Sequence, residues 1–178
     1  PLNFILNFEP KILGDFNYRF GKPEDFAEIF LIMRNLYTGN SSLEELFKYG
    51  YENSVEGNIF VPVTDYFYSR AKDNNAMGFK FMIPDARKGS AMKRMCMYLR
   101  WMVRKGPVDF GLWDFMKPSE LLIPLDTHVA RLSREMGLLS RSANDFKAVI
   151  ELTENLKKFD SEDPVKYDFA MFGYGVNN

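Results

Sequence analysis

Residues 92–104 read MKRMCMYLRWMVR, and this stretch decides the fold class. At about 100° per residue on a helical wheel, the three cations Lys93, Arg100 and Arg104 fall on one narrow face. The opposite face carries no charge and is rich in methionine, which is typical of a buried surface. That face holds Met92, Met95, Cys96, Tyr98, Leu99, Met102 and Val103. We therefore predict an amphipathic helix over residues 90–105.

The sequence on both sides of this stretch also favours helices. Proline in a first turn, an oxygen-bearing cap residue and a glycine after the last turn are typical helix boundaries. They predict helices over residues 23–38, 126–137 and 143–159, a capping box from Ser41 to Glu44, and a last helix that starts at Asp163-Pro164 and ends at Gly173 or Gly175. Residues 58–72 are ambiguous. Residues 106–118 read as a loop, and no dipeptide typical of a β-hairpin is present, so we predict an all-α fold.

Composition excludes several classes of protein. The 178 residues include one cysteine, Cys96, and one histidine, His128. These counts exclude a disulfide framework, a cysteine-rich zinc site and an iron–sulfur cluster held by four cysteines, so we expect no metal and no cofactor. Because Cys96 lies on the apolar face of its helix, we expect a buried structural thiol in a reducing, cytoplasmic compartment.

Membrane and export signals are not expected. No apolar run approaches the roughly 18 residues that a spanning helix needs, so we expect no membrane partner. The first residues, Pro1-Leu2-Asn3, carry no basic region typical of a signal peptide. Since the chain does not begin with methionine, we expect a fragment or a trimmed chain.

Charge is unevenly distributed along a chain whose net charge is −1. Residues 86–141 carry a net charge of +6, whereas the stretches before and after carry −4 and −3. Within residues 86–105, seven residues are basic and none is acidic. A local cationic segment suggests an anionic ligand, with nucleic acid first among the options. The alternatives are a solvated helix face, or neutralisation by acids from another part of the fold.

Lys93 and Asp126 are the candidate catalytic residues. Neighbouring cations favour a neutral lysine amine, which is a nucleophile. The small residues Gly89-Ser90-Ala91 lie before Lys93, where backbone N–H groups at a helix start can hold a phosphate. Asp126 follows an apolar stretch at a predicted helix N-cap, and simple capping is the alternative role for its carboxylate.

The segment from Pro124 to Arg131 fits the pattern Pro-x-Asp-Thr-His-Val-x-Arg. This pattern resembles the catalytic-aspartate helix of the helix-hairpin-helix DNA glycosylases. In that superfamily a Leu-Pro-Gly-x-Gly-x-Lys hairpin precedes the aspartate, and Ile83-Pro84 and Gly89–Lys93 occupy comparable places. The spacing of 33 residues between lysine and aspartate is closest to the archaeal 8-oxoguanine glycosylase branch. Residues 89–175 also resemble an uncharacterised bacterial family assigned to this superfamily.

The resemblance implies two helical lobes, residues 1–80 and 81–178, with a cleft between them. It implies that Lys93 attacks the sugar of a flipped nucleotide and forms a Schiff base, and that Asp126 assists this step. His128 and Arg131 would support the site. The residues expected to contact DNA are Lys88, Gly89, Ser90, Arg94, Arg100 and Arg104. The chain departs from the pattern at Ala91, which replaces the second hairpin glycine.

The resemblance thus implies a base-excision glycosylase with lyase activity, which we expect to be a monomer. Its substrate would be double-stranded DNA that carries an oxidised base such as 8-oxoguanine. Two alternatives remain open at this point. One is a non-catalytic nucleic-acid-binding module with the same fold, and the other is a hydrolase that acts on a modified nucleoside or RNA base.

Overall fold

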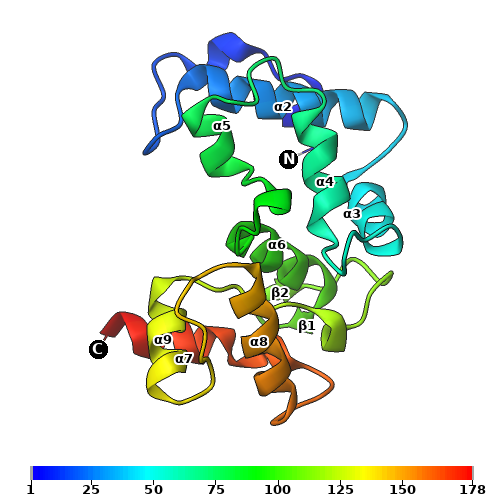
Figure 1. Ribbon diagram of the computed structural model, residues 1–178. Coiled ribbons are helices and arrows are strands. Elements are labelled where there is room, and N and C mark those ends of the chain that lie inside the picture. The colour runs from blue at the N-terminus through cyan, green and yellow to red at the C-terminus, as the bar shows by residue number, and fades with distance from the viewer. Residues whose placement is uncertain (1, 178) are drawn as a thin grey trace. The chain divides into compact units, whose positions relative to one another are not determined.

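The computed structural model describes residues 2–177, and the chain divides into two compact units between Ala86 and Arg87. The regular structure of both units is mostly helical, which confirms the predicted all-α class (Figure 1). The strands within residues 2–177 form one two-stranded antiparallel sheet. None of the helices in that range is long and apolar enough to cross a membrane.

The first unit packs helices around a phenylalanine-rich core. Helix α2 contacts α1 and α5, and α3 packs against α4. Phe8 and Phe60 are fully buried, and Phe8 packs on the ring of Phe30 with 4.9 Å between the ring centroids. The elements are α1 (Leu2–Leu6), the 3-10 turn η1 (Pro10–Leu13), α2 (Pro23–Thr38), α3 (Leu43–Glu52), α4 (Phe60–Tyr68) and α5 (Met77–Met82).

Helix boundaries in the first unit follow the local signals closely. The predicted helix over residues 23–38 is confirmed as α2. The ambiguous stretch contains α4, with Pro62 in the first turn, where a missing N–H does no harm. The cap of α3 is Ser42, whose Oγ accepts a hydrogen bond from the Glu45 amide at 3.1 Å. The predicted pair Ser41–Glu44 was therefore wrong by one residue. Ser41–Glu44 and Ser42–Glu45 both have the spacing that a capping box needs, so the spacing alone could not distinguish them.

The second unit carries the basic segment and all the candidate site residues. Helix α7 packs against α9, α6 contacts β2, and α8 contacts η4 (Figure 1). The elements are η2 (Ala86–Lys88), which spans the division, α6 (Lys93–Val103), β1 (Lys105–Gly106), β2 (Asp109–Phe110), η3 (Pro118–Glu120), α7 (Thr127–Glu135), α8 (Phe146–Lys157), η4 (Pro164–Tyr167) and α9 (Asp168–Asn177).

The core of the second unit contains the apolar face of α6. Met95, Cys96, Leu99 and Val103 are buried, as the wheel predicted. Burial raises the pKa of the Cys96 thiol well above its ordinary value. The prediction of a buried structural thiol is therefore confirmed.

Two predictions for the second unit were wrong. The expected loop contains a hairpin in which Lys105 pairs with Phe110. Its turn is Pro107-Val108, which lacks the Asn-Gly type of signal that marks a hairpin in sequence. The last helical segment begins at Pro164 as a 3-10 turn, and α9 then continues through Gly173 and Gly175 rather than ending there.

Candidate functional site

Lys93 begins α6 directly after a tightly bent turn. Gly89 and Met92 both have left-handed backbone angles, with φ of +72° and +52°. Only glycine adopts this conformation without cost, so Gly89 is the residue type that the turn requires. The carbonyl oxygen of Gly89 accepts a hydrogen bond from the Phe146 amide at 2.9 Å, which fixes the turn to the start of α8. The Lys93 side chain therefore extends from a backbone segment that is held in place.

Asp126 is held by the buried segment that precedes α7. Leu121, Ile123 and Leu125 are each no more than 2% exposed. The Ile123 amide donates a hydrogen bond to Thr153 Oγ1 on α8 at 3.1 Å, which anchors this extended stretch. Asp126 Oδ1 then accepts a hydrogen bond from the Val129 amide at 2.9 Å, so the predicted N-cap is confirmed.

The second oxygen of Asp126 faces Lys93. The distance from Lys93 Nζ to Asp126 Oδ2 is 2.8 Å, although 33 residues separate the two in sequence. The lysine side chain is 39% exposed and the aspartate side chain 14%. Burial raises the pKa of Asp126, but the hydrogen bonds from Lys93 and from the Val129 amide outweigh it, so the pKa lies below its ordinary value. One carboxylate thus caps a helix and holds an accessible lysine.

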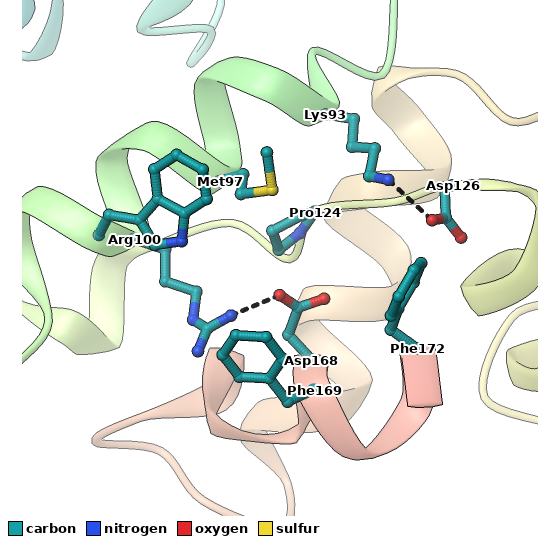
Figure 2. Close-up of a pocket in the computed structure, with 9 residues that line it drawn as sticks. Lys93, Met97, Arg100, Pro124, Asp126, Asp168, Phe169 and Phe172 are labelled. Atoms are coloured by element: carbon teal, nitrogen blue, oxygen red, sulfur yellow. Dashed lines mark hydrogen bonds and ion pairs between the residues drawn. The ribbon is translucent and has the colours of Figure 1, made fainter. Parts of the chain in front are cut away.

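A pocket of about 120 Å³ lies beside this pair (Figure 2). Phe172 extends from α9 beneath Lys93, whose Nζ lies 5.5 Å from the ring centroid. Phe169 belongs to the same helix and stacks on the guanidinium of Arg100 at 4.2 Å. The lining residues are Lys93, Met97, Arg100, Trp101, Pro124, Asp126, Asp168, Phe169 and Phe172. The pocket therefore combines aromatic faces with two carboxyl groups and one lysine.

Arg100 lines the pocket but does not form part of an exposed cationic stripe. It is 1% exposed, and its Nη1 lies 2.6 Å from Asp168 Oδ2. Its Nη2 lies 3.3 Å from Asp109 Oδ2. A buried and neutralised guanidinium cannot reach a DNA phosphate, so the predicted phosphate contact of Arg100 was wrong. The alternative of neutralisation by acids from elsewhere in the fold accounts for this residue.

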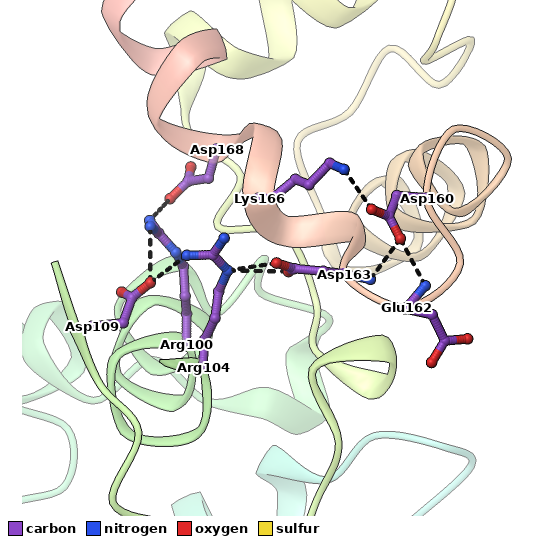
Figure 3. A network of polar contacts seen from close by, with 8 residues as sticks. All are labelled: Arg100, Arg104, Asp109, Asp160, Glu162, Asp163, Lys166 and Asp168. Atoms are coloured by element: carbon purple, nitrogen blue, oxygen red, sulfur yellow. Dashed lines mark hydrogen bonds and ion pairs between the residues drawn. The ribbon is translucent and has the colours of Figure 1, made fainter. Parts of the chain in front are cut away.

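Arg104 belongs to the same network of ion pairs (Figure 3). Its Nη1 lies 2.8 Å from Asp109 Oδ2, and its Nε lies 2.8 Å from Asp163 Oδ2. The side chain is only 17% exposed, so its hydrogen-bonding capacity faces protein rather than solvent. The expectation that Arg104 contacts phosphate is therefore corrected, and its role is to join α6 to η4.

His128 and Arg131 hold the C-terminal helix. His128 Nδ1 lies 3.1 Å from the carbonyl oxygen of Gly175, and Arg131 Nη2 donates to the same oxygen at 2.9 Å. Neither residue lines the pocket. Because Phe172 lies on that helix, His128 and Arg131 support the site through the position of α9.

The other residues predicted to contact DNA lie around the turn before α6. Lys88 and Arg94 are exposed, and Gly89 and Ser90 are partly exposed. Ser90 forms an isolated backbone bridge with Asp145, and its Oγ accepts from the Met92 amide at 3.4 Å. Of the predicted set, Lys88 and Arg94 are thus the two exposed cations.

Three pocket residues from the C-terminal helix α9 received no role from the sequence. They are Asp168, Phe169 and Phe172, all on α9. A signal did exist, because all three lie within residues 89–175, the stretch that resembles an uncharacterised bacterial family. Periodicity could not reveal their roles, since their partner Arg100 lies 68 residues away from Asp168.

Comparisons with known proteins add one match. A search of the curated proteins and a search of the solved structures each found no match. A family model described as "Protein of unknown function (DUF2400)" matches residues 1–177. Since this match covers nearly the whole chain, the protein belongs to the DUF2400 family.

Proposed function

We propose that this protein is a DNA glycosylase with lyase activity, of the helix-hairpin-helix type, that removes an oxidised base such as 8-oxoguanine. The observation that carries the proposal is the contact between Lys93 Nζ and Asp126 Oδ2 at the edge of a pocket with aromatic walls. The bent turn at Gly89, followed at once by the lysine, supports the helix-hairpin-helix assignment.

The lysine–aspartate pair has the chemistry that a glycosylase-lyase needs. The Lys93 ammonium passes a proton to Asp126 and becomes an amine. Its lone pair forms a bond to the sugar C1′, while the bond from C1′ to the base breaks and the base leaves with that electron pair and takes up a proton. The secondary ammonium on C1′ then loses a proton, and the lone pair this frees on nitrogen opens the sugar ring. O4′ takes up a proton, and a protonated imine remains. Loss of a C2′ proton from this imine expels the 3′ phosphate and cuts the strand.

The walls of the pocket suit the flat ring of a flipped base. The faces of a base require flat apolar walls, and the aromatic rings of Phe169 and Phe172 line the pocket, with Phe172 next to Lys93. Stacking on such rings contributes about 1–3 kcal/mol per base. The exposed cations Lys88 and Arg94 lie close to Lys93 in sequence, where they could bind the phosphates beside the flipped nucleotide.

Borohydride trapping tests this proposal directly. Hydride adds to C1′ of the imine and converts it to a stable amine, so wild-type protein incubated with duplex DNA containing 8-oxoguanine or an abasic site should yield a covalent adduct. Lys93→Gln should yield none. Lys105→Gln, on the exposed strand β1 that follows α6, is the matched control and should trap as well as the wild type. Failure of the wild type to trap on either DNA would refute the lyase mechanism.

The neutralisation of Arg100 and Arg104 favours a second candidate, a hydrolase that acts on a modified nucleoside. Such an enzyme would use the same lysine and aspartate but would need fewer cations for a phosphate backbone. The two candidates differ in substrate size. Release of base from a free nucleoside, with no activity on duplex DNA, would favour the hydrolase.

A further inference from the structure

Asp168 is a second carboxyl group in the pocket, with an unusual set of partners. Its Oδ2 accepts a hydrogen bond from Arg100 at 2.6 Å, and the side chain is 11% exposed. The contact with Arg100 is made by Oδ2 and not by Oδ1. Figure 2 shows the carboxyl group at the pocket wall, with one oxygen directed to Arg100 and the other away from it, on the side of Phe172.

The network contains more carboxylates than guanidinium groups, and Asp168 makes the fewest hydrogen bonds to those groups. Arg100 and Arg104 share three carboxylates, those of Asp109, Asp163 and Asp168, so the network carries one negative charge too many (Figure 3). Asp109 contacts both guanidinium groups. Asp163 is bound through both of its oxygens. Asp168 has a single contact, so a proton on its Oδ1 would balance the network at the least cost in ion pairing.

The groups that surround Asp168 act in opposite directions. Arg100 and Lys93 on α6 favour its ionised form, whereas Asp126 at the start of α7 disfavours it. The Cys96 thiol on α6 also interacts with it. Burial is the largest influence, and it raises the pKa of Asp168 above its ordinary value despite the contact with Arg100. A protonated carboxyl in a pocket is a hydrogen donor, which is how general acids are built.

We infer that Asp168 is the general acid that protonates the base as it leaves. This inference rests on the proposed function. As the bond between C1′ and the base breaks, the base takes the electron pair together with the Oδ1 proton of Asp168. The Asp168 carboxylate that results is neutralised in place by Arg100. The secondary nitrogen formed on C1′ releases a proton on imine formation, and this proton restores the acid. Asp126 serves the nucleophile, and Asp168 serves the leaving group.

Two DNA substrates separate this role from the lyase chemistry. Duplex DNA with 8-oxoguanine requires both base release and imine formation. The same duplex with an abasic site has no base to protonate and requires only imine formation and strand cleavage. We expect Asp168→Asn to slow base release about 100-fold or more, within the range of lost general-acid catalysis. It should change trapping and cleavage at the abasic site by less than about threefold, because Lys93 and Asp126 are intact.

Asp109→Asn is the matched control. It removes one carboxylate from the same network and from the same guanidinium, but Asp109 does not line the pocket. Asp109→Asn should change the rate of base release and the rate of abasic-site cleavage by the same factor. If Asp168→Asn releases base at the wild-type rate, or slows both substrates by the same factor, Asp168 is not the acid. If the wild type is inactive on both substrates, the proposed function itself fails, and this inference fails with it.

The wild-type protein supplies a second measurement that needs no variant to fold. Both reactions require the Lys93 amine, so the ionisation of Lys93 affects both rates alike. The ratio of the base-release rate to the abasic-site cleavage rate is therefore independent of that ionisation. Because an acid works only when protonated, the ratio should fall about tenfold per pH unit above the pKa of Asp168. A ratio that does not change with pH would overturn the inference.

Discussion

Arg100 and Asp168 form a buried ion pair, with 2.6 Å between Nη1 and Oδ2. Removal of the arginine would leave Asp109 and Asp168 facing each other without their shared cation. We therefore expect Arg100→Ala to lower the free energy of unfolding by about 3–5 kcal/mol, as measured by urea denaturation. Lys105→Ala, on the exposed strand β1, should change it by less than about 0.5 kcal/mol. Equal stability of the two variants would contradict the buried network.

DNA affinity should depend on the exposed cations instead. Each phosphate contact that is lost reduces the slope of log affinity against log salt by about one unit. We expect this change for Lys88→Ala and for Arg94→Ala, measured by fluorescence anisotropy over a range of salt concentrations. Arg104→Ala should leave the slope unchanged, because Asp109 and Asp163 already neutralise its guanidinium. A reduced slope for Arg104→Ala would show that the ion pairs open when DNA binds.

Asp126→Asn separates capping from catalysis. Asparagine is nearly as good an N-cap as aspartate, so the melting temperature should change little. An amide cannot take the proton of Lys93, so trapping and base release should fall by a factor of about 100 or more. Asp145→Asn is a close control, because Asp145 caps α8 through the Ala148 amide and pairs with Arg141, away from the pocket. Full activity of the Asp126 variant would leave that residue as a cap alone.

Acid should weaken the second unit through Asp145. The hydrogen bond from Arg141 is the main cause that lowers its pKa to about 2. A carboxyl whose pKa is lowered by folding stabilises the protein above its unfolded pKa of about 3.9, and this contribution is lost as the pH falls toward 2. Melting temperatures of the wild type should therefore fall more steeply than those of Asp145→Asn between about pH 4 and pH 2. Parallel curves would exclude a contribution from this residue.

Two glycines near the end of α9 should respond differently to alanine. A Cβ on Gly175 would lie 3.1 Å from the carbonyl oxygen of His128, whereas a Cβ on Gly173 would meet nothing within 4 Å. Alanine in a helix is favoured over glycine by up to about 1 kcal/mol. We expect Gly173→Ala to raise the melting temperature, and Gly175→Ala to raise it less or to lower it. The reverse order would contradict the close packing of α7 and α9.

Local signals in the sequence predicted the helices and the cap well. Proline, acids and glycine marked α2, and Asp126 marked α7, because these signals act within one helical turn. The wheel also placed Lys93 and Arg100 on one face, and both line the pocket. It could not show that α9 covers part of that face. The acids that neutralise Arg100 lie 9 and 68 residues away in sequence, at distances where periodicity carries no information.

The single cysteine makes it possible to measure how often the core of the second unit opens. Cys96 is 1% exposed on the helix that begins with Lys93, and it is the one thiol in the sequence. An alkylating reagent can modify it only when α6 separates from the core, because only an exposed thiolate reacts at an appreciable rate. Labelling of the native protein, followed by mass spectrometry, would therefore measure how often the framework of the pocket opens. No probe would have to be introduced for that measurement.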